Sequence, residues 1–305
     1  MEFREFIYIL KVAEEKSFST AAKKLFITQP SLSQYIIRVE ENLGVRLFDR
    51  SSVPITLTYA GEQFIEMARD ILNLRQQLQK RMDDIANLKN ERITIGISQY
   101  RGKYFLPKVL PAFQESYPGV EVVIREDSAL GLENLVHMGE VDFSIQILPI
   151  RSKGIKYTVI CEEDYLIAVS PQHAINVSSS IDKKISSYPV INLSDLQDEK
   201  FILLKPGFPG RTIADRIFER EGFYPKSILE TRSLETAHAL AASGFGVAFV
   251  SEILITYCAP QLRAKYFFIK NCSPGQVVLI ATYKENAYLS KATLAFLEIA
   301  KQVFK

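Results

Sequence analysis

Three polar side chains near the start of the chain are spaced so that one helix would present them together. Ser31, Gln34 and Arg38 follow one another at intervals of three and four residues, in a stretch without a helix breaker, and a helix places such residues on one face. Gln can pair with an adenine edge, Arg with a guanine edge or a phosphate, and Ser with either. This set of groups is suited to reading base edges in the major groove of DNA.

The same stretch has an apolar face that would hold such a helix against a core. Its apolar residues recur at helical spacing, and they are Leu32, Ile36, Val39 and Leu43. Thr28 or Gln29 can cap the helix, and Pro30 suits its first position, where a missing N–H is no loss. The pattern predicts an amphipathic helix with its polar side exposed.

A second short helix is predicted immediately upstream, over Thr20–Leu25, with Ser19 as its cap. Phe26 and Ile27 fall in the turn between the two helices, and we expect both to pack inward. Two short helices joined by a tight turn match the helix-turn-helix pattern. A solvated helical hairpin would show the same pattern, so these residues alone leave that alternative open.

A longer set of residues resembles the N-terminal signature of the LysR-type transcriptional regulators. The spacing is correct throughout, and the resemblance is specific over the first fifth of the chain and looser beyond it. The matching positions are Phe6 through Val12, Ser17-Phe18-Ser19, Ala21-Ala22, Leu25, Gln29-Pro30-Ser31-Leu32-Ser33, Glu40, Leu43-Gly44, Leu47-Phe48, Arg50, Leu57-Thr58 and Ala60-Gly61. The resemblance implies a sequence-specific DNA-binding regulator and not an enzyme.

The candidate contacts with double-stranded DNA lie in this region and in the wing that follows it. The segment 45–58 predicts two short strands, Leu47-Phe48 and 55–57. The wing of this chain has Val53, Pro54 and Thr56 where related wings usually carry more Arg or Lys, so we expect a shallow salt dependence of DNA binding. The predicted DNA-binding residues are Ser19, Thr28, Gln29, Pro30, Ser31, Ser33, Gln34, Arg38 and Arg50.

A long helix is predicted over 60–88, and its apolar residues step alternately by four and three, interrupted by Arg75. This spacing is typical of helices that pair, and the resemblance also implies a homodimer or homotetramer. Packing of the helix on its own C-terminal domain is the alternative. The apolar residues are Phe64, Ala68, Ile71, Leu78, Met82 and Ile85.

From Arg92 onward, apolar strands alternate with helices, which predicts largely parallel sheets with helices on both faces. Two such halves, joined by extended crossings near 164–170 and 277–283, would resemble a periplasmic-binding-protein-like effector domain. The fold class is therefore α+β and multidomain. The expected domains are a winged helix-turn-helix at 1–59, a linker helix at 60–91 and an effector domain at 92–305, with lobe I at 92–163 and 270–305 and lobe II at 164–269.

Ligands of open α/β sheets bind beyond the carboxyl ends of the strands, near helix N-termini. The loop around Arg211, with Gly207 and Gly210, would suit a carboxylate or phosphate, so we expect a small anionic effector. The resemblance also assigns Ser98 to the effector cleft. An ordinary surface turn is the alternative at each position. The predicted effector-binding residues are Ser98, Gln99, Tyr100, Ser128, Ile147, Leu204, Lys205 and Arg211.

The composition is that of an ordinary globular protein, with 305 residues, 47% hydrophobic residues and a net charge of +2. This length predicts two or three domains. The charge does not by itself indicate nucleic acid, although cations outnumber anions between Ala21 and Arg50. The sequence shows no signal peptide, membrane span or catalytic motif, so we expect a cytoplasmic protein without a cofactor, with RNA polymerase as a candidate partner.

The cysteines and histidines are few and scattered. Cys161, Cys258 and Cys272 lack metal-ligand spacing, which argues against structural zinc. Two other readings stay open: a regulator that senses redox state through Cys258 and Cys272, and a cytoplasmic solute-binding protein with the two-lobed fold.

Overall fold

The computed structural model describes residues 2–86, 92–174, 187–257, 263–273 and 275–305. The chain divides into two compact units, Met1–Leu88 and Lys89–Lys305, and each is considered by itself. No helix among the described residues is both long enough and apolar enough to cross a membrane.

The N-terminal unit is built on three helices, α1 (Phe3–Glu15), α2 (Phe18–Lys24) and α3 (Gln29–Leu43). The predicted apolar face of α3 is buried at Leu32, Ile36 and Val39, whereas Leu43 is partly exposed. Thr28 caps α3, because its Oγ1 accepts a hydrogen bond from Ser31 N at 3.3 Å. The amphipathic pattern therefore gave the correct helix and the correct core face.

Two details of the helix-turn-helix differ from the prediction. Ser17, not Ser19, caps α2, and its Oγ accepts from Thr20 N at 3.3 Å. Phe26 is 95% exposed instead of packed inward. Its φ of 57° lies in the left-handed region, and the turn directs only the next side chain, Ile27, into the core.

The wing consists of β1 (Phe48–Asp49) paired antiparallel with β2 (Thr56–Leu57). A buried carboxylate on α3 fixes its root. Glu40, 8% exposed, accepts hydrogen bonds from Leu47 N at 2.8 Å and Phe48 N at 3.2 Å. The Arg50 Nη2 donates to the second carboxylate oxygen of Glu40 at 3.0 Å. Glu40 therefore ties the wing to α3.

The unit ends in the 27-residue helix α4 (Tyr59–Ile85), which Thr58 caps. Its first half packs on the small core through the buried Ile65 and Ala68. Its second half carries exposed apolar side chains, which are Ile71, Leu74, Leu78, Met82 and Ile85.

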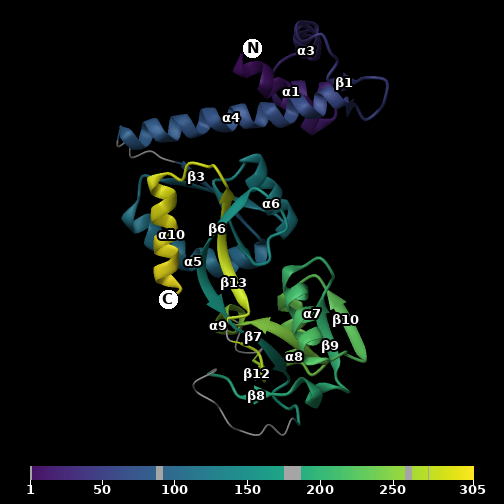
Figure 1. The fold of residues 1–305 in the computed structure, drawn as a ribbon, viewed down its shortest axis with the longest axis vertical. Helices are drawn as coiled ribbons and strands as arrows, with labels where there is room; N and C mark the ends of the chain where they lie inside the picture. Colours follow the sequence, from purple (N-terminus) through teal and green to yellow (C-terminus); the bar gives the residue numbers. More distant parts are fainter. Residues whose placement is uncertain (1, 87–91, 175–186, 258–262, 274) are drawn as a thin grey trace. The chain divides into compact units, whose positions relative to one another are not determined.

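Lobe I of the C-terminal unit, which carries the labels β3, α5, α6 and α10 in Figure 1, is a five-stranded sheet in the order β4-β3-β5-β13-β6. The strands are β3 (Arg92–Ile97), β4 (Glu121–Glu126), β5 (Phe143–Ile147), β6 (Ile155–Glu163) and β13 (Val277–Lys284). Helices α5 (Gln99–Ser116), α6 (Ala129–Met138) and α10 (Lys291–Val303) pack on it.

The two faces of this sheet are covered differently. Phe105 of α5 and Phe296 of α10 are fully buried in one core with Ile95. On the other face of β3, Gly96 lets α6 and β5 pack closely against the strand. A Cβ at this position would lie 3.1 Å from a methyl carbon of Leu132 on α6 and 2.8 Å from the Ser144 Cβ on β5.

Lobe II is a six-stranded sheet in the order β10-β9-β11-β7-β12-β8. The strands are β7 (Tyr165–Val169), β8 (Val190–Ile191), β9 (Lys200–Leu204), β10 (Ser227–Thr231), β11 (Val247–Ser251) and β12 (Lys265–Ile269). Its helices are α7 (Pro209–Glu221), α8 (Leu234–Ala242), α9 (Glu252–Tyr257) and the 3₁₀ turn Leu193–Leu196.

The two-lobed α/β architecture is confirmed, but both sheets are mixed. In lobe I, β3 runs parallel to β4 and β5, whereas β13 is antiparallel to β5 and β6. In lobe II, β7 runs antiparallel to both of its neighbours, β11 and β12. The antiparallel strands arise because the chain crosses between lobes in the middle of its course.

The positions of the crossings also differ from the prediction. The segments 164–170 and 277–283 belong largely to the strands β7 and β13; the first change of lobe falls at Asp164, between β6 and β7, and the second falls after β12 ends at Ile269 and before β13 begins at Val277. The sequence reading missed β6, β8, β12 and α9. Strand β6 lies at a sheet edge with an exposed outer face, so its residues lack the apolar run that marks the central strands.

We predict that Glu40→Ala loosens the wing without unfolding the chain. The amides of Leu47 and Phe48 would lose a buried acceptor, at a cost of about 1–3 kcal/mol, and Arg50 would lose its ionic partner. Amide exchange across 46–50, followed by mass spectrometry, should quicken at least tenfold. Glu41→Ala, on the exposed side of the same helix, should leave exchange unchanged, and equal rates in both variants would contradict the role of Glu40.

Candidate functional site

The exposed face of α3 presents the polar groups singled out in the sequence. Ser31, Gln34 and Arg38 are exposed opposite the buried Leu32 and Ile36. No described residue forms a hydrogen bond or ion pair with the side chain of Gln34 or Arg38. Gln29 and Pro30 are exposed at the N-terminus of the same helix. This face therefore holds donors and acceptors that are free to meet a ligand.

Other predicted DNA contacts have partners within the unit. The Arg50 Nη1 donates to Ser33 Oγ at 3.3 Å, and its guanidinium lies 4.9 Å from the centroid of the Phe18 ring. With Glu40 as its ion-pair partner, Arg50 acts as a brace between wing and α3. Thr28 serves as the cap of α3, and Ser19 is exposed in the first turn of α2.

The wing offers little free positive charge. Between the start of β1 and the end of β2 the charged residues are Asp49 and Arg50, and Arg46 lies exposed just before β1. Hydrogen bonds from the Ser51 hydroxyl and backbone N–H hold the pKa of Asp49 below its usual value, so this side chain is an anion at neutral pH. The tip is apolar, with Val53 99% exposed. The shallow salt dependence expected of such a wing stays a prediction.

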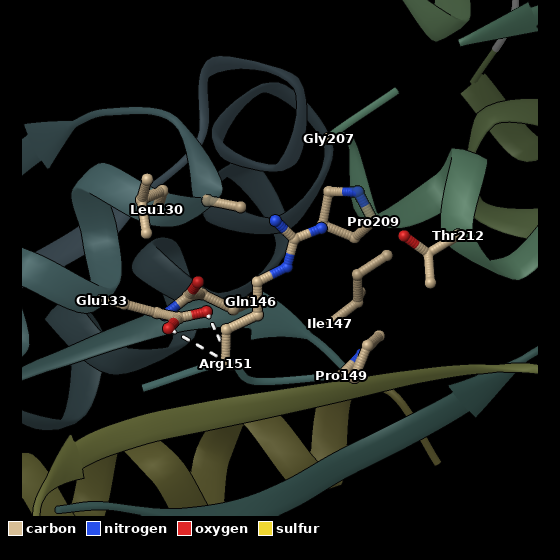
Figure 2. A pocket seen from close by; sticks show the side chains of 10 residues that line it. Leu130, Glu133, Gln146, Ile147, Pro149, Arg151, Gly207, Pro209 and Thr212 are labelled. Carbon is tan, nitrogen blue, oxygen red and sulfur yellow. Dashed lines mark hydrogen bonds between the residues drawn. The ribbon is translucent and has the colours of Figure 1, made fainter. Parts of the chain in front are cut away.

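A small pocket lies between the lobes of the C-terminal unit (Figure 2). Lobe I contributes α6, the end of β5 and the loop that follows, and lobe II contributes the start of α7. The lining residues are Ala129, Leu130, Glu133, Gln146, Ile147, Pro149, Arg151, Gly207, Pro209 and Thr212.

The predicted effector residues lie in and around this region, but only Ile147 lines the pocket itself. Ser98 and Ser128 cap α5 and α6, accepting from Arg101 N at 3.3 Å and Gly131 N at 3.2 Å. The remaining predicted positions outside the pocket include the exposed Gln99 and Lys205 and the half-buried Leu204.

Arg211 does not supply the free cation expected of it. Its Nε donates to Asp215 at 2.8 Å, and its Nη1 donates to Glu230 at 2.7 Å and to the Leu204 carbonyl at 3.0 Å. These contacts join α7 to strands β9 and β10. Arg211 is therefore a structural brace of lobe II, because two carboxylates already neutralise it.

Tyr100 also has a structural role, because it contacts lobe II. Its ring packs against the core of lobe II, and its hydroxyl lies 2.7 Å from Ser251 Oγ. Burial raises the pKa of Tyr100 to about 12. One turn along α5, the Tyr104 hydroxyl donates to Glu235 of α8 at 2.6 Å. These tyrosines of lobe I fasten α5 to lobe II.

The sequence reading missed Arg151, which is the exposed cation of the pocket. Its guanidinium points toward Gly207 and Pro209 in Figure 2, and no described residue accepts a hydrogen bond from it. The buried Glu133 carboxylate holds the base of this loop by accepting from Arg151 N at 3.2 Å and Ser152 N at 2.7 Å. Arg151 could have been found as a cation shortly after the carboxyl end of a predicted strand.

The described cysteines are poor candidates for redox sensing. Burial raises the pKa of Cys161 to about 12, and burial also raises the pKa of Cys272, against which Arg220 lies. Both thiols therefore stay protonated at neutral pH, and the thiolate is the reactive form. Cys258 lies outside the described residues.

Two family models match the chain. Residues 3–62 match the bacterial regulatory helix-turn-helix protein, lysR family, and residues 86–305 match the LysR substrate binding domain. The uncharacterized HTH-type transcriptional regulator YcgK of Bacillus subtilis (strain 168) is 31% identical over 313 residues, which cover 100% of this chain and 95% of YcgK. BenM of Acinetobacter baylyi is 31% identical over 254 residues, covering 82% and 80% of the two chains.

Solved structures show the same fold. A full-length variant of OxyR from Pseudomonas aeruginosa superimposes with a TM-score of 0.74 at 22% identity, covering 100% of this chain and 94% of OxyR. A full-length BenM variant gives a TM-score of 0.56 at 28% identity, covering 100% and 96%. The chain therefore belongs to the LysR family of transcriptional regulators, with an N-terminal DNA-binding domain and a C-terminal effector-binding domain.

Proposed function

We propose that this regulator reads its operator through α3, as a homodimer or homotetramer in the cytoplasm, under the control of a small anionic effector. The observation that carries the proposal is the exposed, unpartnered pair Gln34 and Arg38 above the buried face of the same helix. The related protein CbnR has been solved in complex with its target DNA. We further propose that the protein has no catalytic activity and that RNA polymerase is a partner.

Pairing through α4 is supported by the exposed apolar side chains of its second half, among them Leu78, Met82 and Ile85. Such a stripe gains stability when a second copy covers it. A dimer places two α3 helices on two half-sites, so contacts that are weak singly combine. We accordingly divide the chain into a DNA-binding domain at 1–59, a linker segment at 60–91 that includes most of the dimerisation helix α4, and an effector domain at 92–305.

The anionic character of the effector is supported by Arg151 instead of Arg211. Arg151 brings an unpaired guanidinium to the pocket, and the N-terminus of α7 faces the same space. Both favour a carboxylate or phosphate. An effector that touches both lobes favours one lobe arrangement over another, and a few kcal/mol of such preference would shift the oligomer geometry.

Removing the amide of Gln34 should weaken specific operator binding. We expect Gln34→Ala to cost about 1–3 kcal/mol, since one bidentate base contact is worth that much, and Ser31→Ala to weaken binding in the same direction. Gel-shift titration gives the affinity, and size-exclusion chromatography checks that the oligomer persists. Gln114→Ala, the same change on an exposed part of α5, is the control. Unchanged operator affinity in Gln34→Ala would refute the assignment of α3.

Adding a cation to the wing should steepen the salt dependence. Each new phosphate contact adds about 0.9 to the slope of log K against log salt concentration, so Val53→Arg should add about 2 per dimer. Val53→Ala is the matched control and should leave the slope as it is. An unchanged slope in Val53→Arg would mean that the wing does not approach the phosphates.

Loss of Arg151 should abolish recognition of acids in the cleft. We expect a panel of small carboxylates and phosphate to raise the melting temperature of the wild-type protein but not of Arg151→Met. The control is Lys153→Met, which removes an exposed cation from the same loop. Stabilisation that survives in Arg151→Met, or disappears equally in Lys153→Met, would contradict the proposed anionic effector.

A further inference from the structure

We propose that the effector is a hydroxy acid, whose hydroxyl donates a hydrogen bond to Gln146 while its acid group meets Arg151. The inference rests on the anionic effector proposed above and adds the second group that the site recognises. We infer this second group from the hydrogen bonds that orient the Gln146 side chain.

Gln146 is buried, at 6% exposure, yet it lines the pocket. It stands two residues beyond Ser144 on β5, so both side chains lie on one face of the sheet. Thr282 on the neighbouring β13 is paired with Ser144 in the strand register. The Gln146 Nε2 donates to Ser144 Oγ at 2.8 Å and to Thr282 Oγ1 at 3.0 Å.

The hydrogens of this cluster can be placed from its contacts. The Thr282 hydroxyl donates to the Ser144 backbone carbonyl at 3.3 Å. The Ser144 hydroxyl can then donate to Thr282 Oγ1, which lies 2.6 Å away. Both hydroxyl oxygens are left as acceptors. The group of the Gln146 amide that faces them must therefore be the donor, NH₂. The amide oxygen is therefore kept out of the cluster as a pure acceptor.

No described residue donates to this amide oxygen, so an acceptor is left for a group that enters the pocket. A ligand that donates to this acceptor gains a hydrogen bond, and the site consequently favours a ligand that supplies one donor there. Gln146 and Arg151 line the same pocket in Figure 2. A ligand there meets an acceptor at one point and a cation at another.

The neighbouring carboxylate favours a hydroxyl over an ammonium group as the donor. Glu133 has the charge to hold an ammonium, but its oxygens already accept from the backbone of Arg151 and from the N–H and hydroxyl of Ser152. An ammonium brings three donors, whereas a hydroxyl brings the single donor that Gln146 requires. A hydroxy acid therefore fits the groups present.

Titration calorimetry with matched acids tests the proposal on the full-length protein. The pairs are lactate against propionate and malate against succinate, with 1,2-propanediol as the neutral hydroxyl compound. We expect at least one hydroxy acid to bind about tenfold more tightly than its partner, as one hydrogen bond would give, and the diol not to bind. Gln146→Met should abolish this preference and retain the weaker binding of the deoxy acid.

Thr282→Val provides a second variant that keeps Gln146 but removes one of the hydroxyls that orient it. The preference for the hydroxyl should shrink there, with Arg151-dependent binding retained. Equal binding of both members of each pair, or a preference that survives in Gln146→Met, would overturn the hydroxy-acid proposal and leave the anionic effector standing. Binding of the diol but of no acid, or of no compound at all, would overturn both.

Discussion

The buried carboxylate of Glu40 is the contact on which the geometry of the DNA-binding domain depends. It comes from the helix proposed to read bases, and it accepts hydrogen bonds from the wing backbone at Leu47 and Phe48 and from Arg50. A carboxylate this buried needs such partners, because an unpaired charge away from water is costly. The wing and α3 therefore keep one relative position, which a rigid groove in DNA requires.

This arrangement supports the proposal that α3 supplies most of the contacts with DNA. Arg50 is occupied by Glu40 and Ser33, Asp49 is ionised, and the tip of the wing is apolar at Val53. Phosphate contacts set position and base contacts set sequence. Because the strands and tip of the wing hold no unpaired cation, we propose that Gln34 and Arg38 carry a larger part of the affinity, and that the same few side chains set both specificity and affinity.

The sequence predicted what depends on periodicity and failed where distant segments meet. The apolar face of α3 and the long helix α4 follow from local spacing. The role of Arg211 did not follow from spacing alone, because one of its carboxylate partners, Glu230, comes from strand β10. Its other partner, Asp215, lies four residues along the same helix, and this spacing is visible in the sequence. Gln146 was not among the predicted effector residues, since its cluster depends on Thr282, 136 residues away. Phe26 turned outward because backbone conformation, not hydrophobicity, sets its direction.

The most direct test of the central claim is methylation interference on an operator selected by this protein from random DNA. A methyl group on guanine N7 lies in the major groove, whereas a methyl group on adenine N3 lies in the minor groove. If two α3 helices read two half-sites, N7 methylation should block binding in two clusters separated by one helical turn or a multiple of it. A single cluster, or interference confined to the minor groove, would contradict the account.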